Sequence, residues 1–197
     1  MKIGLFFGSF NPIHHGHLII GKTIVESALV DEVWFVVSPQ NPFKKENSLL
    51  NARHRFNLVR TALEGEQKMR ASDIEFGLPK PSFTVNTLVY LSEKYPKHEF
   101  LIVLGSDGFE NINKWKNADY IIENHGFLVY NRPGNIVSEK LIAKYSLIEG
   151  PLLSISSTYI RKKIMEGKNI RFLVPDSVAE EIEKNNYYRG DLEKESR

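Results

Sequence analysis

The sequence predicts an α/β protein built on a Rossmann-like, doubly wound parallel sheet. Short runs of valine, isoleucine, leucine and phenylalanine alternate with longer segments of helical periodicity along most of the chain. Glycine, proline, serine or asparagine follows each run, as expected where a strand ends in a loop. In this class of fold ligands bind beyond the carboxyl ends of the strands, so we expect the chemistry in the loops that follow them.

Six apolar runs are the expected strands. Most are apolar along their whole length, which is typical of parallel strands covered by helices on both faces. In chain order they are residues 2–7, 32–37, 69–74, 100–104, 126–130 and 147–149.

The segments between these runs are the expected helices. Apolar side chains at positions 18, 19, 20, 24, 25, 28 and 29 fall on one wide helical stripe, which predicts a helix over residues 18–29. The same periodicity predicts further helices over residues 52–63, 85–94, 138–145, 157–166 and 177–184.

The chain of 197 residues is long enough to bury one continuous core, and it contains no internal repeat or low-complexity linker. We therefore expect a single domain over residues 1–189. Residues 190–197 are too polar to pack and are expected to form a disordered tail.

The composition excludes several classes of function. With 42% hydrophobic and 25% charged residues, the chain has no apolar run near the roughly 20 residues of a membrane span, and its first apolar run is too short for an export signal. The absence of cysteine excludes disulfides, cysteine-ligated zinc, iron–sulfur clusters and thiol nucleophiles, and favours a cytoplasmic location. A net charge of +2 is too small to indicate a nucleic-acid partner.

The stretch GSFNPIHHGH, residues 8–17, follows the first expected strand and leads into the first expected helix. Gly8 allows a ligand to approach the backbone, Pro12 fixes the chain direction, and Gly16 leaves room at the helix entry. The free amides of a helix N-terminus attract anions, so a phosphate fits here. The stretch lacks both the G-x-G-x-x-G dinucleotide fingerprint and a G-K-[ST] phosphate loop, which disfavours a Rossmann-type oxidoreductase.

Three interpretations of the histidines compete. They could cap and pack the helix, or His14 and His17, three residues apart, could bind zinc from one helix face. No cysteine, aspartate or glutamate lies nearby in the sequence to complete a zinc site. The third interpretation is hydrogen-bond donation to phosphate, and the position at a helix N-terminus after a glycine-bearing turn favours it.

The stretch resembles the (H/T)xGH motif of the nucleotidylyltransferase superfamily, with His14 and His17 at its named positions and His15 at its variable one. The resemblance implies a nucleotidylyltransferase type of Rossmann-like fold. It also implies that ATP contacts the turn at Gly8, Ser9 and Phe10. Asn11 stands where the superfamily more often has aspartate.

The stretch ISSTYIR, residues 155–161, resembles a second element of these enzymes, which closes the ATP site. Taken alone, it is an ordinary helix start with Ser156, Ser157 or Thr158 as cap. Beside the first motif, its hydroxyls and amides are expected to hold phosphate oxygens. Arg161, one turn into the helix, offers a planar guanidinium to the β and γ phosphates.

Within the superfamily the chain most resembles the bacterial nicotinate-nucleotide adenylyltransferases, over nearly its whole length. SPQNPFK, residues 38–44, is similar to their phosphate-facing loop and places Lys44 at its lysine, although Phe43 replaces a usual histidine. LPKPSFTVNTL, residues 78–88, resembles the segment that meets the nicotinate carboxylate through amides near Thr84, with Ser82 beside it. Thr84 is also a good helix cap, and Asn86 replaces the usual aspartate.

Two later segments complete the resemblance. LGSDGFENINKW, residues 104–115, resembles a pattern in which Gly105 permits close approach of ATP and Asp107 accepts hydrogen bonds from the ATP ribose. In the same pattern Trp115 stacks on the pyridine ring, with Lys116 next to it. Arg132, in VYNRPG, follows the fifth expected strand and faces the adenylate end.

The resemblance implies adenylyl transfer from ATP to nicotinate mononucleotide, with Mg²⁺ bound through the ATP phosphates, and it names no metal-ligating residue of this chain. Because the attacking phosphate is already an anion, no strong base is required, and Lys44, His14, His17 and Arg161 are the expected catalytic residues. Phosphopantetheine or nicotinamide mononucleotide adenylyltransferases and a non-catalytic nucleotide-binding module remain alternatives. The expected partners are small-molecule substrates, neither nucleic acid nor membrane, and the chain could form a homo-oligomer.

Overall fold

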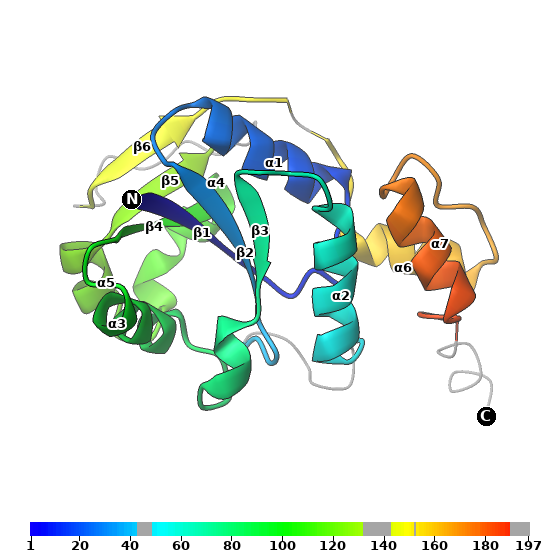
Figure 1. The fold of residues 1–197 in the computed structure, drawn as a ribbon, viewed down its shortest axis with the longest axis horizontal. Helices are drawn as coiled ribbons and strands as arrows, with labels where there is room; N and C mark the ends of the chain where they lie inside the picture. The colour runs from blue at the N-terminus through cyan, green and yellow to red at the C-terminus, as the bar shows by residue number, and fades with distance from the viewer. Residues whose placement is uncertain (43–48, 132–142, 152, 190–197) are drawn as a thin grey trace.

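A six-stranded sheet forms the centre of the molecule in the computed structural model, which describes residues 1–42, 49–131, 143–151 and 153–189 (Figure 1). The strand order is β3-β2-β1-β4-β5-β6, and every neighbouring pair is parallel. The expected doubly wound parallel sheet is therefore confirmed. The strands are β1 (Lys2–Gly8), β2 (Glu32–Val37), β3 (Met69–Ser72), β4 (Glu99–Gly105), β5 (Gly126–Tyr130) and β6 (Tyr145–Ile148).

Helices cover both faces of this sheet (Figure 1). The α-helices are α1 (His15–Glu26), α2 (Ala52–Ala62), α3 (Thr84–Lys94), α4 (Ser106–Glu110), α5 (Ala118–Asn124), α6 (Ser157–Met165) and α7 (Asp176–Lys184). Two short 3-10 helices, η2 (Ile74–Gly77) and η3 (Ile112–Lys114), stand before α3 and before α5.

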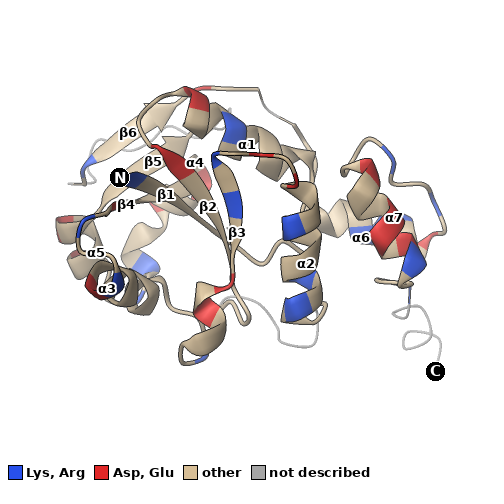
Figure 2. Ribbon diagram, viewed as in Figure 1, with Lys and Arg blue, Asp and Glu red and all other residues tan. Residues whose placement is uncertain are grey.

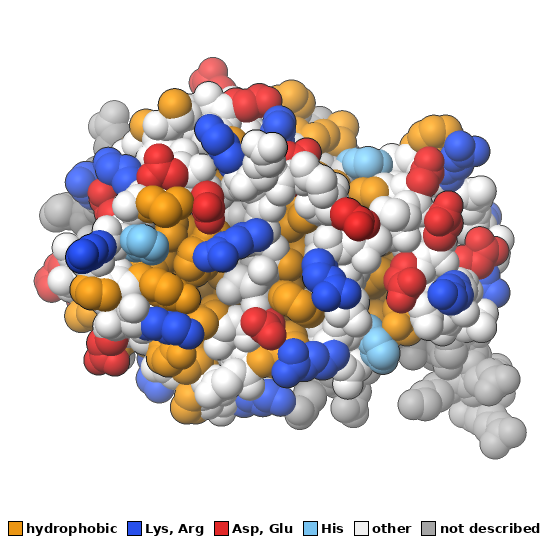
Figure 3. Space-filling view, in the orientation of Figure 1, with side chains coloured by type: hydrophobic (Ala, Val, Ile, Leu, Met, Phe, Trp, Pro, Cys, Tyr) orange, Lys and Arg blue, Asp and Glu red, His pale blue; other side chains and the backbone are white. Residues whose placement is uncertain are grey.

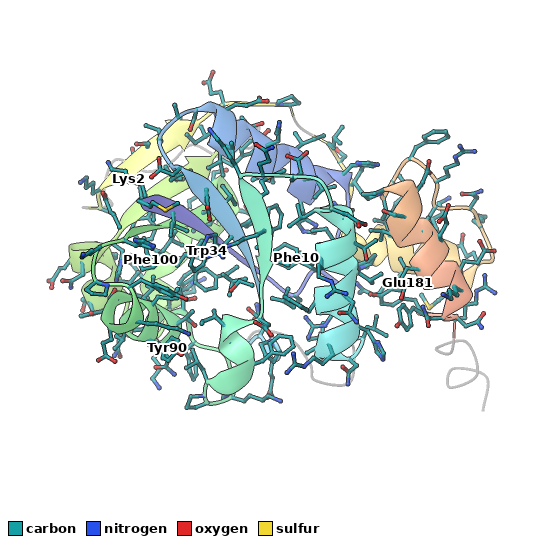
Figure 4. All side chains as sticks on the ribbon, viewed as in Figure 1. Lys2, Phe10, Trp34, Tyr90, Phe100 and Glu181 are labelled. Carbon is teal, nitrogen blue, oxygen red and sulfur yellow. The ribbon has the colours of Figure 1, made fainter. Side chains whose placement is uncertain are left out.

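The two faces of the sheet carry separate hydrophobic clusters. Along β2, Val33, Phe35 and Val37 join the cluster under α1, α2, α6 and α7, whereas Trp34 and Val36 join the cluster under α3, α4 and α5. Figure 4 shows Phe10 between the sheet and α2, and Trp34 and Phe100 toward the α3 side. Alternation along a strand that is buried on both faces thus produces two cores.

The structure corrects several expected element boundaries. The first helix begins at His15 and not at residue 18, and it ends at Glu26. The third strand ends at Ser72, because residues 74–77 turn into η2. The sequence pattern did not predict the short elements α4 and α5.

The helix expected over residues 138–145 is wrong at its end. Tyr145 begins β6, where it pairs with Phe127 of β5, and residues 138–142 lie outside the described part. Apolar residues at 141, 142 and 145 imitate a helical stripe, but pairing with the sheet decides the conformation of residue 145. Residues 190–197, the expected tail, also lie outside the described part.

Acidic and basic side chains are interspersed on the ribbon and on the face that Figure 3 displays, where hydrophobic side chains lie between them (Figures 2 and 3). Within the residues that the structure describes, no helix is both long and apolar enough to cross a membrane. The charge pattern on this face therefore does not locate the site.

The order of the strands places the site. The chain runs outward from β1 through β2 to β3, and then crosses back to β4 on the other side of β1. β1 and β4 are therefore neighbours at which the strand order reverses, and their carboxyl ends lie together at Gly8 and Gly105. This reversal point is where such sheets bind ligands.

Candidate active site

Two cavities open beyond the carboxyl end of the sheet. The smaller one has a volume of about 350 Å³ and lies between the starts of α1 and α6. The larger one has a volume of about 510 Å³ and lies over the ends of β1 and β4, against α3 and α4. The smaller cavity is lined by residues of the first and second motifs, and the larger one by the residues expected at the nicotinate end.

The turn after β1 forms one wall of the smaller cavity. A Cβ atom at Gly8 would stand 2.7 Å from the Phe10 ring, so only glycine fits against that ring. Phe10 itself is 2% exposed and packs on Phe6 and Phe35 in the core. Its side chain therefore shapes the turn, and only its backbone is left for a ligand.

His14 and His17 lie side by side at the start of α1. Their rings are stacked with centroids 3.7 Å apart, and the rings of His17 and Phe10 meet in an edge-to-face arrangement with centroids 5.1 Å apart. A Cβ at Gly16 would stand 3.0 Å from the His14 ring, which explains the glycine between them. Both imidazoles line the smaller cavity, whereas His15 is not part of its lining.

The first turn of α1 has fewer available amides than a bare helix start offers. The His15 amide donates to the carbonyl of Leu173, 3.1 Å away, and the His17 amide donates to the carbonyl of His14, 2.9 Å away. The expectation of a generic helix-terminus anion site is therefore too simple. An anion bound here would meet the imidazoles and the opposite wall more than free backbone amides.

The opposite wall is the start of α6. Ser156 caps this helix by accepting a hydrogen bond from the Tyr159 amide at 3.2 Å, as the capping interpretation expects. The Ser157 hydroxyl donates to the carbonyl of Pro12 at 2.9 Å and fastens the helix to the turn after β1. Ser156, Ser157 and Thr158 all line the cavity.

Arg161 closes the smaller cavity between its two walls. Its guanidinium donates to the backbone carbonyl of Asn11 at 2.8 Å and to the Thr158 hydroxyl at 3.3 Å. The Asn11 side chain is 2% exposed and accepts a hydrogen bond from the Leu50 amide at 3.1 Å. The asparagine at position 11 thus keeps a structural hydrogen bond in the loop.

The larger cavity collects the residues expected at the nicotinate end. Thr84 begins α3 and Ser82 lies two residues before it, while Trp115 and Lys116 come from the segment after η3. Trp115 is half-buried and packs on the cluster under α3. The Lys116 ammonium lies 4.4 Å from the centre of the Phe83 ring, which fixes the lysine at the edge of the cavity.

The remaining expected residues are placed as follows. Gly105 and Asp107, expected at ATP, line the larger cavity and not the smaller one, together with the residues expected at the nicotinate end. Ser9 is 4% exposed and lines neither cavity. Lys44, Phe43 and Arg132 lie outside the described residues.

Sequence reasoning missed two buried ionisable residues, Arg55 and Glu75. Arg55 is 1% exposed, and burial lowers the pKa of its guanidinium to about 10. Its position could have been noticed, because residues 55, 58, 59 and 62 form the apolar stripe of α2 and an arginine there is anomalous.

Glu75 had no comparable signal, since η2 is too short to show a period. It is 2% exposed, and its carboxyl accepts a hydrogen bond from the Thr87 hydroxyl at 2.8 Å. Burial raises the pKa of Glu75, and the nearby hydroxyls of Thr87, Ser38 and Ser82 offset part of the rise. Ser38 and Ser82 line the larger cavity, so Glu75 lies behind its wall.

The arrangement can neutralise a polyphosphate in the smaller cavity and hold an aromatic ring in the larger one. Among the residues that the structure describes, no three histidine, aspartate or glutamate side chains come together as a metal-ion site. A site that can hold phosphates and a flat ring at the reversal point of a parallel sheet is typical of nucleotide-binding proteins.

Comparison with known proteins agrees with this geometry. The family model described as cytidylyltransferase-like matches residues 5–163. A relative from Cytophaga hutchinsonii, named as a nicotinate-nucleotide adenylyltransferase, is 51% identical over 95% of this chain and 98% of its own length. A relative of the same name from Flavobacterium johnsoniae is 49% identical over 96% of this chain and the whole of its own.

Solved structures give the same result. The Plasmodium falciparum nicotinic acid mononucleotide adenylyltransferase complexed with NaAD superimposes with a TM-score of 0.83, at 25% identity, covering 97% of this chain and 98% of that one. The same enzyme complexed with APC gives a TM-score of 0.81 with the same identity and coverage. The likeness therefore extends over both cavities and over the helices that form them.

Proposed function

Since the chain belongs to the cytidylyltransferase-like family, within which it groups with the nicotinate-nucleotide adenylyltransferases, we propose that it transfers an adenylyl group from ATP to nicotinate mononucleotide. The products are nicotinate adenine dinucleotide and pyrophosphate, so the reaction is a step in the biosynthesis of NAD. The observation that carries the proposal is the pair of cavities at the reversal point, one lined by His14, His17 and Arg161 and the other by Trp115.

The reaction joins two anions. An oxygen of the mononucleotide's 5′-phosphate forms a bond to the α-phosphorus of ATP, and the bond from that phosphorus to the oxygen that links it to the β-phosphorus breaks, so that this oxygen leaves with the pyrophosphate. Negative charge therefore increases on the leaving group. Catalysis by positioning and charge neutralisation suffices, because the nucleophile needs no deprotonation.

The smaller cavity is proposed to hold the triphosphate. Arg161 presents a guanidinium fixed by Asn11 and Thr158, which suits bidentate contact with phosphate oxygens. The stacked imidazoles of His14 and His17 face the same space from the start of α1. Lys44, assigned from the motif, is proposed to add a further positive charge between the two substrates.

The larger cavity is proposed to hold nicotinate mononucleotide. Trp115 offers a ring face on which the pyridine can stack, and Lys116 stands beside it. The first amides of α3, from Thr84 onward, are proposed to meet the nicotinate carboxylate, since a helix N-terminus favours a negative group. Asp107 and Gly105 line the same cavity, and we propose that they meet the ribose next to the pyridine.

Mg²⁺ is proposed to enter with ATP, held by its phosphates and by water, as this ion often is in nucleotide-dependent enzymes. When bound it would neutralise phosphate charge. Among the described residues, His14, His17 and Arg161 are proposed to face the charged phosphates, together with Lys44 from the motif. We propose that the reaction takes place in the cytoplasm, in keeping with a chain that contains no cysteine.

The proposal is tested by measuring pyrophosphate release from ATP and Mg²⁺ with one acceptor at a time. Release with nicotinate mononucleotide, and little with nicotinamide mononucleotide or phosphopantetheine, is the expected result. Preferential release with either of the other two acceptors would transfer the assignment to the corresponding adenylyltransferase. Release with none of them, although ATP binds, would indicate a nucleotide-binding module without turnover.

A further inference from the structure

Arg55 ends in a fully buried guanidinium that none of the motifs contains. It projects from the first turn of α2, and its side chain is 1% exposed. Its hydrogen-bond acceptors are backbone carbonyls: Leu50 at 2.7 Å from Nε, Ser9 at 2.6 Å and Ser38 at 3.0 Å from one terminal nitrogen, and Pro39 at 2.9 Å from the other.

These carbonyls belong to separate segments of the chain. Ser9 lies in the turn after β1, Ser38 and Pro39 follow β2, and Leu50 precedes α2. Ser38 lines the larger cavity, and the turn that contains Ser9 leads to His14 in the smaller one. One side chain therefore joins a wall of each cavity.

A further connection leads from Arg55 to Arg161. The Leu50 carbonyl accepts from Arg55, the Leu50 amide donates to the Asn11 side chain at 3.1 Å, and the Asn11 carbonyl accepts from Arg161 at 2.8 Å. The backbone of Leu50 and then the side chain and backbone carbonyl of Asn11 thus connect the buried arginine to Arg161 at the smaller cavity.

Filling space alone does not explain this residue. Burying a cation is costly, and a hydrophobic side chain of similar volume would pack at position 55 on the apolar stripe of α2 without that cost. Burial lowers the pKa of Arg55 to about 10, so the guanidinium stays charged at neutral pH and all of its hydrogen-bonding directions remain donors. The group is suited to hold several carbonyls at fixed positions.

We propose that Arg55 is a positioning residue that holds the two substrate cavities at a fixed position relative to each other, so that the mononucleotide phosphate is aligned for attack on the α-phosphorus of ATP. The inference rests on the proposed function. It assigns to Arg55 no contact with either substrate. Its consequence is that each substrate can bind without Arg55, whereas the reaction between them suffers.

The test compares R55K and R55A with the wild type and with R60A, which removes an exposed arginine from the same helix. In R55K, a charge remains but the fork of donors is lost. We expect calorimetry to give ATP binding at the wild-type stoichiometry and KM values for both substrates within about threefold, while kcat falls about 100-fold, the usual effect of a misplacement near 1 Å. R60A should behave as the wild type.

Chemical rescue separates positioning from general damage. Ethylguanidinium at millimolar concentration should raise kcat of R55A about tenfold or more toward the wild type, by occupying the space that the side chain left, and should not raise kcat of the wild type or R60A. If R55A does not fold, R55K and R55Q take its place, and the test is whether their kcat falls while their KM values stay near those of the wild type.

Three results would overturn the inference: kcat of a folded R55K or R55A within about twofold of wild type; a fall in kcat that only mirrors a lower binding stoichiometry; or loss of binding of one substrate alone. Failure of the proposed function is distinguishable, because the wild type itself would then release no pyrophosphate with nicotinate mononucleotide.

Discussion

The guanidinium of Arg161 donates a hydrogen bond to the backbone carbonyl of Asn11, 2.8 Å away, although 150 positions separate the two residues in the chain. This contact joins the starts of α1 and α6 into the walls of one cavity. Both sequence motifs are therefore parts of a single site, and each depends on the other for its geometry.

Replacing Arg161 should remove both the hydrogen bond that joins the two walls of the smaller cavity and the proposed contact with phosphate. R161A is expected to lose about 100- to 1,000-fold in kcat/KM, as for a preorganised donor at a charged transition state, with its fold intact. R161K should recover only part of the loss, since lysine cannot contact phosphate through two parallel bonds. Steady-state kinetics with a circular dichroism check measure this, and K162A, at the exposed neighbouring position, is the control.

The paired imidazoles should matter more than their neighbour. H14A and H17A are each expected to lower turnover about 100-fold or more, because both rings line the phosphate cavity. H15A, outside that lining, should retain most of the activity. Turnover of H17A close to that of the wild type, measured by pyrophosphate release, would contradict the assignment of this histidine.

Asn11 should tolerate aspartate better than alanine. Its side-chain oxygen accepts from the Leu50 amide, and a carboxylate in N11D can keep that bond. N11A leaves a buried amide without its acceptor, at a cost of about 1–3 kcal/mol in the free energy of unfolding. Urea denaturation of both variants checks the difference. An N11A variant as stable as N11D would show that the bond to Leu50 is unimportant.

Trp115 should affect one substrate and not the other. Loss of ring stacking in W115A is expected to raise KM for the mononucleotide about 10- to 100-fold, on the scale of about 1–3 kcal/mol for stacking a base on an aromatic side chain. W115F should keep most of the affinity. KM for ATP should stay unchanged in both, because Trp115 lines only the larger cavity. An equal rise in KM for both substrates would argue against separate cavities.

Glu75 should make stability depend on pH. Burial raises the pKa of its carboxyl in the folded state, so the folded chain holds the proton more tightly than the unfolded one. The resulting stabilisation is complete below the ordinary pKa of a glutamate and is lost as pH rises through the higher folded value.

The E75Q variant tests the direction of this dependence of stability on pH. Its free energy of unfolding, relative to wild type, should increase as pH rises above the ordinary glutamate range and level off beyond the folded pKa. Denaturant titrations at several pH values measure the difference. Parallel pH profiles for the two proteins would contradict the raised pKa.

Periodicity predicted the sheet well because its strands are buried on both faces and read as continuous apolar runs. It failed at Tyr145, whose conformation is decided by pairing with Phe127. It also missed the start of α1, since glycine and histidines at positions 15–17 conceal a helical turn. Local pattern cannot report contacts that depend on the sheet.

For the site, the two motifs named His14, His17 and Arg161, which line the smaller cavity together. They also named Gly8, Ser9 and Phe10, which do not line it. They left open which of three hydroxyls caps α6, and they could not predict the bond from Arg161 to Asn11 or the placement of Asp107 in the larger cavity. Arg55 acts through backbone carbonyls, which carry no sequence identity, so no motif could have specified its partners.

Following a phosphorus label from ATP into the products tests the central claim most directly. With ATP labelled at the α-phosphate, Mg²⁺ and nicotinate mononucleotide, we expect the label to appear in nicotinate adenine dinucleotide and the pyrophosphate to remain unlabelled. Label that stays in ATP or appears only in AMP, with no labelled dinucleotide, would contradict adenylyl transfer to this acceptor.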